Sequence, residues 1–313
     1  MNFQQLRIIR ETARCNYNLT EVASALFTSQ SGVSKHIMEL EDELGVELFV
    51  RRGKRYLGLT EPGKELLAIA NRILLDVGNI KHLAEHFSKR DEGRLTVVTT
   101  HTQARYALPP IVTRFREAFP KVQLVLHQAS PAEIVKMLQE GQADIGLATE
   151  ALEGVEHLVS FPYYQWRHAV IVPVGHPLGS LPELTLEAIA DYPVVTYHEG
   201  MTGRTLVDRT FDEAGLSPQI VMTALDADVI KTYVELGMGI GIVASMAFDA
   251  ERDHKLRLLD CSTLFGQNTT RLAVRKGHYL RDFTTHFIRL CSPDIPPDLI
   301  RSEVMGEPRP ALG

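Results

Sequence analysis

Cysteine is scarce in this sequence of 313 residues, and its spacing argues against two common kinds of site. Cys15, Cys261 and Cys291 form no CxxC pair and have no His or Cys at metal-ligand spacing. We therefore expect neither a disulfide framework nor a bound metal or other cofactor. The three thiols are expected to be reduced and mainly structural, with a redox role for Cys15 as an open alternative.

Long apolar runs and a strong excess of one charge are also missing. No stretch approaches the ~20 apolar residues that would span a bilayer, and Arg7, Arg10 and Glu11 interrupt the region where a signal peptide would be apolar. The formal net charge of −6 argues against indiscriminate binding to polyanions. We expect a cytoplasmic protein without a membrane partner, in which any contact with DNA comes from a local basic patch.

Residues 18–45 carry the pattern of two short helices joined by a tight turn. The apolar residues of each helix recur at helical spacing, which gives each one stripe to bury against the other. Thr28 or Ser29 is expected to cap the second helix, and Gly45 to end it in a left-handed conformation. The pair predicts a helix-turn-helix whose second helix enters a DNA major groove. The residues expected on or near the bases are Gln30, Ser31, Ser34, Lys35 and His36.

A basic hairpin is predicted directly after this helix pair, over residues 46–60. Two short strands surround a turn at Gly53, and the tip carries four cations and no acid: Arg51, Arg52, Lys54 and Arg55. We expect this wing to contact phosphates, and residues 1–59 to form a winged helix-turn-helix domain. The alternatives are an all-α helix pair that never meets nucleic acid and a basic run that is a solvated loop.

A long helix is predicted over residues 60–87, because Thr60 precedes Glu61, Pro62 and Gly63, a helix-start signature. Its apolar residues keep a strict interval of four and three through three heptads, at Leu66, Ala70, Ile73, Val77, Ile80, Ala84 and Phe87. This spacing is typical of a coiled-coil seam and predicts a homodimer. The alternative is a helix that lies on its own domain.

The remainder of the chain, residues 93–313, alternates strand and helix patterns in two successive rounds. The expected strands are 95–100, 122–128, 143–149, 168–174, 193–197, 219–225, 239–245 and 269–276. The alternation predicts two Rossmann-like α/β lobes with parallel sheets, of the periplasmic-binding-protein type, with a cleft between them. We expect one lobe over 93–163 and 267–292 and the other over 164–266, after a hinge at 88–93. The segment from Ser292 has five prolines and is expected to be irregular.

These segments together resemble the LysR-type transcriptional regulators over essentially the full chain. The resemblance rests on SQSGVSKHIMELEDELGVELFVRR, on TEPG at the start of the long helix, and on the two-lobed pattern. TTHTQARYALP (99–109), ATEAL (148–152), TGR (202–204) and the segment 223–247 resemble the CysB group. Ser31 replaces the usual proline, and the C-terminal tail is short.

The resemblance implies a homo-oligomeric regulator that binds an interrupted dyad in double-stranded DNA. It implies that the chain forms a dimer, that two dimers join as a tetramer, and that the protein can contact RNA polymerase. It implies activation of sulfur-assimilation and cysteine-biosynthesis genes, with acetylserine as inducer and small sulfur anions as anti-inducers. A paralogous regulator of sulfonate or another sulfur source, with a different anionic effector, is the alternative.

Polar residues at the carboxyl ends of predicted strands mark a site for such an effector. Backbone N–H groups at helix starts and threonine hydroxyls can hold a small anion or an acetylated amino acid, and these positions meet at one crevice in open α/β sheets. The expected residues are Thr100, Thr102, Gln103, Thr149, Thr202 and Gly203. For any single threonine, a helix cap is the alternative.

An enzyme is not expected. GMGIGI (237–242) follows a helix and enters a strand, which reverses the order that dinucleotide binding requires. His101 and Glu150 could form an acid–base pair, but no nucleophile motif such as GxSxG accompanies them. A two-lobed solute-binding protein is less consistent with the first 90 residues.

Overall fold

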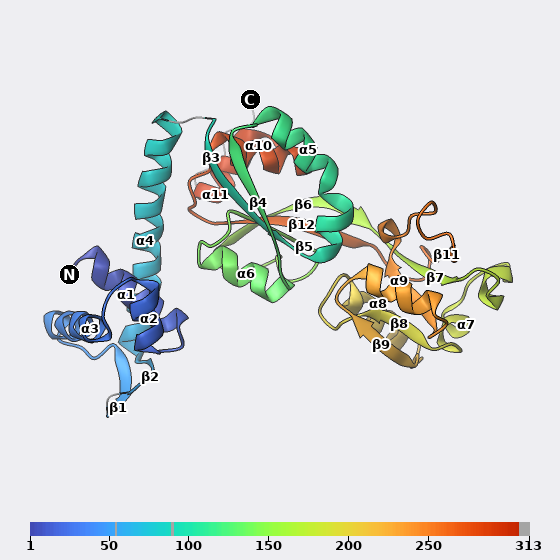
Figure 1. Cartoon of the computed structure of the whole chain (residues 1–313), viewed down its shortest axis with the longest axis horizontal. Helices are drawn as coiled ribbons and strands as arrows, with labels where there is room; N and C mark the ends of the chain where they lie inside the picture. Colours follow the sequence, from blue (N-terminus) through green and yellow to red (C-terminus); the bar gives the residue numbers. More distant parts are fainter. Residues whose placement is uncertain (54, 89–90, 307–313) are drawn as a thin grey trace. The chain divides into compact units, whose positions relative to one another are not determined.

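The computed structural model describes residues 1–53, 55–88 and 91–306, which fall into two compact units, Met1–Ala84 and Glu85–Gly313. The first unit holds three helices followed by an antiparallel hairpin (Figure 1), whose elements are α1 Phe3–Arg14, α2 Leu19–Ala25, α3 Gln30–Leu44, β1 Phe49–Arg52 and β2 Arg55–Leu59. Lys54 lies outside the described residues.

Local sequence signals set the bounds of α3. The Ser29 hydroxyl accepts the Gly32 N–H at 3.1 Å, and Gly45 ends the helix with φ of 68°. Val33, Ile37 and Leu40 are fully buried in one apolar cluster with α1, α2 and the hairpin. The helix-turn-helix and its wing are therefore as the sequence predicts.

The long helix α4, Glu61–Ser88, divides into two parts that differ in burial. In its first part Ala70 and Leu74 are buried against Leu6 of α1, with Ile73 packed beside them. Further along, Ile80 is 66% exposed and Leu83 42%. The first half of the predicted seam is thus partly occupied by the chain's own α1, and the second half is open.

The second unit contains two five-stranded sheets (Figure 1), which we call lobe 1 and lobe 2. Lobe 1 has strand order β4-β3-β5-β12-β6. Its strands are β3 Gly93–Thr99, β4 Val122–Gln128, β5 Ile145–Ala148, β6 Leu158–Trp166 and β12 Asn268–Arg275. Its helices are η1 Gln103–Ala107, which is a π-helix, α5 Pro109–Ala118, α6 Pro131–Gln139, α10 Asp282–Cys291 and α11 Pro297–Met305.

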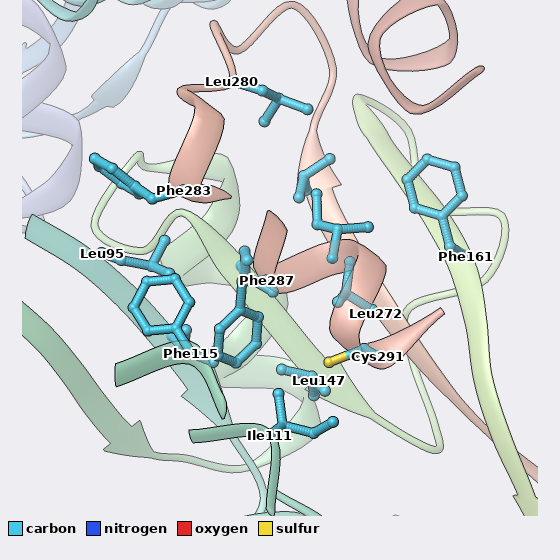
Figure 2. Packing of buried hydrophobic residues seen from close by; sticks show 14 of the residues in the cluster. Leu95, Ile111, Phe115, Leu147, Phe161, Leu272, Leu280, Phe283, Phe287 and Cys291 are labelled. Carbon is cyan, nitrogen blue, oxygen red and sulfur yellow. The ribbon is translucent and has the colours of Figure 1, made fainter. Parts of the chain in front are cut away.

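Alternating side chains give the lobe 1 sheet two covered faces. Leu95 and Leu147 pack with α5, α10 and α11, and Figure 2 shows Phe115 and Phe287 in this layer. Val98 and Ala148 lie on the same two strands but point to the other face, where they pack with α6. Because successive residues of a strand point to opposite faces, these strands need apolar residues at both odd and even positions.

Lobe 2 repeats the arrangement with strand order β11-β7-β10-β8-β9. Its strands are β7 His168–Pro173, β8 Val194–Tyr197, β9 Ile220–Ala224, β10 Ile240–Ala244 and β11 Leu256–Asp260. Its helices are η2 Pro177–Ser180, α7 Leu186–Ala190, α8 Arg204–Glu213, α9 Ala227–Glu235 and η3 Ser245–Ala247. Helices α7 and α8 cover one face and α9 the other. The chain crosses between the lobes from β6 to β7 and from β11 to β12.

Three details differ from the sequence-based expectations. The sheets are mixed, since β7 and β12 run antiparallel to their neighbours. The edge strands β6 and β11 were not predicted. The segment after Ser292, expected to be irregular, contains α11, which buries Ile300 and Val304 in lobe 1. Residues 89 and 90 of the expected hinge and 307–313 of the tail lie outside the described part.

Among the helices in the described residues, none is both long and apolar enough to cross a membrane.

Candidate functional site

The outward face of α3 carries the polar residues predicted to read DNA. Gln30, Ser31 and Lys35 are exposed, whereas Ser34 and His36 are half-buried. Glu39 on the same helix lies 3.6 Å from the Lys35 amine and 3.4 Å from His36 Nδ1. This carboxylate, which the sequence reasoning missed, lowers the positive charge of the face and limits its non-specific attraction to phosphates.

The wing cations divide into one that is paired and two that are available. Arg51 bonds the buried carboxylate of Glu41 and lies over the Tyr56 ring at 4.8 Å. Glu41 in turn accepts the Leu48 N–H at 2.8 Å, so that Arg51 helps to fix the wing to α3. Arg52 and Arg55 are exposed, and neither forms an ion pair with another described residue.

Helix and wing share one recess on this unit. A cavity of about 280 Å³ brings Gln30 from α3 beside Arg55 from β2, with Thr20 from α2 at its margin. The residues predicted to meet bases and those predicted to meet phosphates therefore border the same surface.

In the second unit, Thr102 and Thr202 meet across the cleft between the lobes. Thr102 begins the π-helix that follows β3, and Thr202 precedes α8; their hydroxyls are 3.3 Å apart and both side chains are buried. Neither hydroxyl caps a helix: Thr102 stands at the start of η1 but accepts no N–H from it, and the residue at the start of α8 is Gly203, not Thr202. The helix-cap alternative is thus excluded for these two residues, and the predicted pair is brought together.

Thr100 and Gln103 are buried beside Thr102. The Gln103 side-chain oxygen accepts the Tyr164 hydroxyl at 2.5 Å, while its amide nitrogen has no partner among the described residues. A buried donor without a partner is costly and is usually satisfied by something bound.

Thr149 lies at the end of β5, on the side of the cleft next to the crossing strands. Its hydroxyl is 3.3 Å from that of Thr270, and the Trp166 indole N–H donates to both hydroxyls, at 3.3 and 3.1 Å. Thr149 and Gly203 also line a cavity of about 330 Å³ between the lobes. Thr149 is thus near the Thr102–Thr202 pair but faces a more open part of the cleft.

Glu150 is the main residue of this cleft that the sequence reasoning did not assign to it. Its carboxylate reaches from the end of β5 to the start of α8, where it accepts the Gly203 N–H. Burial raises the pKa of Glu150 above its ordinary value, although backbone N–H groups that include those of Gly203 and Thr202 favour the charged form. The only sequence signal was an acid directly after a buried strand.

A second set of polar contacts joins the lobes nearby. The Tyr106 hydroxyl donates to Asp228 at 2.9 Å, and Arg105 lies 3.4 Å from the same carboxylate. His101, Asp226 and Asp228 are close enough to hold a metal ion, but Lys231 already lies 3.2 Å from Asp228. A cation there would compete with three existing partners, so this cluster is better explained as a contact between lobes.

Comparison with known proteins agrees with this architecture. Residues 3–64 match the bacterial regulatory helix-turn-helix proteins of the lysR family, and residues 88–294 match the LysR substrate binding domain. The chain is 55% identical to the HTH-type transcriptional regulator SsuR of Burkholderia cenocepacia, over 94% of this chain and 96% of that protein. It is 49% identical to the regulator CysB of the same organism, over 98% of each chain.

A solved structure supports the two-lobed unit directly. The cofactor-binding domain of the Cbl transcriptional regulator shares 45% identity, covers 68% of this chain and 94% of its own, and aligns with a TM-score of 0.67. The helix-turn-helix with its wing lies within residues 3–64, and the two mixed sheets lie within residues 88–294, so a match falls in each unit of the structure. The protein therefore belongs to the LysR family of transcriptional regulators, which bind DNA and small effectors and form oligomers, and it is not an enzyme.

Proposed function

We propose that this protein is a cytoplasmic activator of sulfur-assimilation and cysteine-biosynthesis genes, controlled by a small anionic or acetylated amino-acid effector. Acetylserine is the proposed inducer and a sulfur oxyanion the anti-inducer. The support is the resemblance of its motifs to the CysB group together with the identity to CysB over 98% of the chain. Residues 1–59 are assigned to DNA binding, 60–87 to dimerisation and 93–313 to effector binding.

A second candidate is a paralogous regulator of sulfonate or other sulfur-source use, with a different anionic effector. The observation that favours a paralogue is that the chain is 55% identical to SsuR, a regulator distinct from CysB in the same organism, and 49% identical to CysB. The two candidates share the fold and the cleft and differ in which anion binds.

The observation that carries the effector site is the buried polar lining between the lobes. The Thr102 and Thr202 hydroxyls face each other, the Gln103 amide lacks a partner, and Gly203 presents the N–H group at the start of α8. Oriented N–H groups and hydroxyls stabilise an anion without a cation beside it. The proposed contacts are Thr100, Thr102, Gln103, Thr149, Thr202 and Gly203.

A substitution that keeps shape and deletes a hydroxyl tests this site. Thr102→Val leaves a ligand oxygen unpaired, which costs about 1–3 kcal/mol and weakens binding roughly 5- to 150-fold. Calorimetric titration of acetylserine, thiosulfate and sulfate into the full-length protein measures this loss. Thr113→Val, on the exposed side of α5, is the control and should bind as the parent does. Equal binding by Thr102→Val and the parent, or no binding of the three compounds by the parent, would refute the proposed site.

For DNA, we propose that a homodimer binds an interrupted dyad, with Gln30, Ser31, Ser34, Lys35 and His36 on or near the bases and the wing cations on phosphates. The exposed second half of α4 supplies the dimer contact. Two dimers are proposed to join as a homotetramer, with RNA polymerase as a further partner at activated promoters.

A further inference from the structure

The start of α8 in lobe 2 is occupied by an anion that belongs to lobe 1. Helix α8 has ten residues and lacks a side-chain cap of its own. The Gly203 N–H instead donates to the Glu150 carboxylate, which extends from the end of β5. A carboxylate is favoured at this position by the partial positive charge of the helix start.

We call the position of the Glu150 carboxylate at the start of α8 the α8 seat. Buried polar groups without partners near Glu150 indicate that this position can also bind another polar group. The second oxygen of Glu150 is buried without a partner among the described residues, as is the amide nitrogen of the fully buried Gln103 in the same cleft. The His168 side chain is 1% exposed and lies so close to Gly203 that a Cβ at that position would be 2.9 Å from Nε2. Glycine at position 203 therefore lets the start of α8 pack directly against His168, with φ of 74°, a backbone conformation that favours glycine.

We propose that Glu150 is a built-in competitor of the effector, which holds the α8 seat in the ligand-free protein and is displaced when an anion binds. This inference rests on the proposed function of the cleft. The carboxylate or sulfur oxyanion of an effector carries the same charge and accepts the same N–H groups as Glu150 does. Two like charges within about 4–6 Å disfavour each other by a factor of about 10 or more, so the two anions exclude each other from one seat.

The open part of the cleft offers the displaced carboxylate a place to go. Glu150 lines the cavity of about 330 Å³ together with Arg209 and Arg271. Arg209 is 65% exposed and lies 3.8 Å from Glu213, and Arg271 bonds Glu153, which is 73% exposed. Both arginines can accept a new anionic neighbour without losing a buried partner. Effector binding is thus an exchange of one anion for another at α8, which removes the direct link between Glu150 and lobe 2.

The exchange makes Glu150 a residue that sets effector affinity and class. It selects compact anions whose oxygens can replace a carboxylate on the N–H group of Gly203. It also keeps the ligand-free lobes in contact, beside the Thr102–Thr202 and Tyr106–Asp228 contacts.

Neutralising Glu150 tests the competition. Sulfate is titrated into the full-length protein and binding is followed by the fluorescence of Trp166, the single tryptophan, which is bonded to Thr149 next to Glu150. Glu150→Gln should lower the dissociation constant for sulfate at least about tenfold, because the competing charge is gone. Glu153→Gln removes the same charge from the same cavity but not from the seat, and should stay within about twofold of the parent.

The possible outcomes separate this inference from the proposed function. If Glu150→Gln binds sulfate no more tightly than the parent while Thr102→Val binds it more weakly, the competition is overturned and the effector site stands. A parent and a Glu150→Gln protein that bind neither sulfate, thiosulfate nor acetylserine overturn both. Glu150→Ala must show the same tighter binding as Glu150→Gln, which guards against an effect of the amide itself.

Discussion

The open half of α4 predicts where the dimer can be broken without unfolding the chain. Ile80 is 66% exposed and Leu83 42%, whereas Ile73 packs with the chain's own Leu6, Ala70 and Leu74. A charge at position 73 would therefore disturb the DNA-binding unit itself. Ile80→Lys instead places a cation only where we expect the partner's helix.

The size of the effect follows from the exposed surface. Full burial of an isoleucine side chain contributes about 1.5–3 kcal/mol, so two-thirds of it contributes about 1–2 kcal/mol in each copy. In a two-fold dimer both copies lose this contribution, which gives about 2–4 kcal/mol, or a rise of roughly 30- to 700-fold in the dissociation constant. Repulsion between the two new lysines adds to this.

Sedimentation velocity over a dilution series measures the dissociation constant of the dimer. Ala68→Lys is the matched control, since it adds the same charge to an exposed position on another face of α4. Its dimer should be as stable as that of the parent. An unchanged association in Ile80→Lys would refute the assignment of the dimer contact to this helix.

Two further predictions concern charge in each unit. Burial lowers the pKa of His168 from 6.5 to about 4. Between these two values the unfolded chain binds a proton at His168 and the folded chain does not. The free energy of unfolding should therefore fall by about 2 kcal/mol between pH 7 and pH 5. Urea unfolding followed at Trp166 should show this drop in the parent and not in His168→Asn, and equal drops would contradict it. Arg52→Ala should reduce the salt slope of DNA binding by about one for each bound copy of the chain without changing sequence preference, whereas Arg51→Ala should mainly destabilise the wing by leaving Glu41 without its cation. Gel shifts at several salt concentrations separate the two variants, and an altered sequence preference in Arg52→Ala would refute its role on phosphates.

Features that depend on local chemistry were predictable from the sequence. Ser29 and Gly45 bound α3 because a hydroxyl at the start and a left-handed glycine at the end act within one turn. The strands with apolar residues on both faces were likewise identified. The missed strands β6 and β11 are both sheet edges, and β6 contains Pro162, which is tolerated there beside a register shift.

Features that depend on distant contacts were harder to predict. Pro297 was interpreted as a sign of irregular structure, but it stands in the first turn of α11, where its missing N–H costs nothing. The meeting of Thr102 with Thr202 followed from the rule that strand ends converge. For Glu150 the sequence showed only an acid after a buried strand, because its contact with Gly203 arises only when the topology brings α8 of the other lobe to it.

We expect an anion in the cleft to control how the protein binds DNA, and a paired titration measures this coupling. The full-length parent and Thr102→Val are titrated with acetylserine, once by Trp166 fluorescence and once by a footprint on the promoter upstream of the protein's own target genes. Coupling between two sites is reciprocal. The acetylserine concentration at the midpoint of the footprint change should therefore equal the midpoint of the fluorescence change, once the effect of bound DNA on effector affinity is included. Thr102→Val should raise both midpoints by the same factor. A footprint that does not respond to a ligand bound in the cleft, or that responds equally in Thr102→Val, would show that the cleft does not control DNA binding.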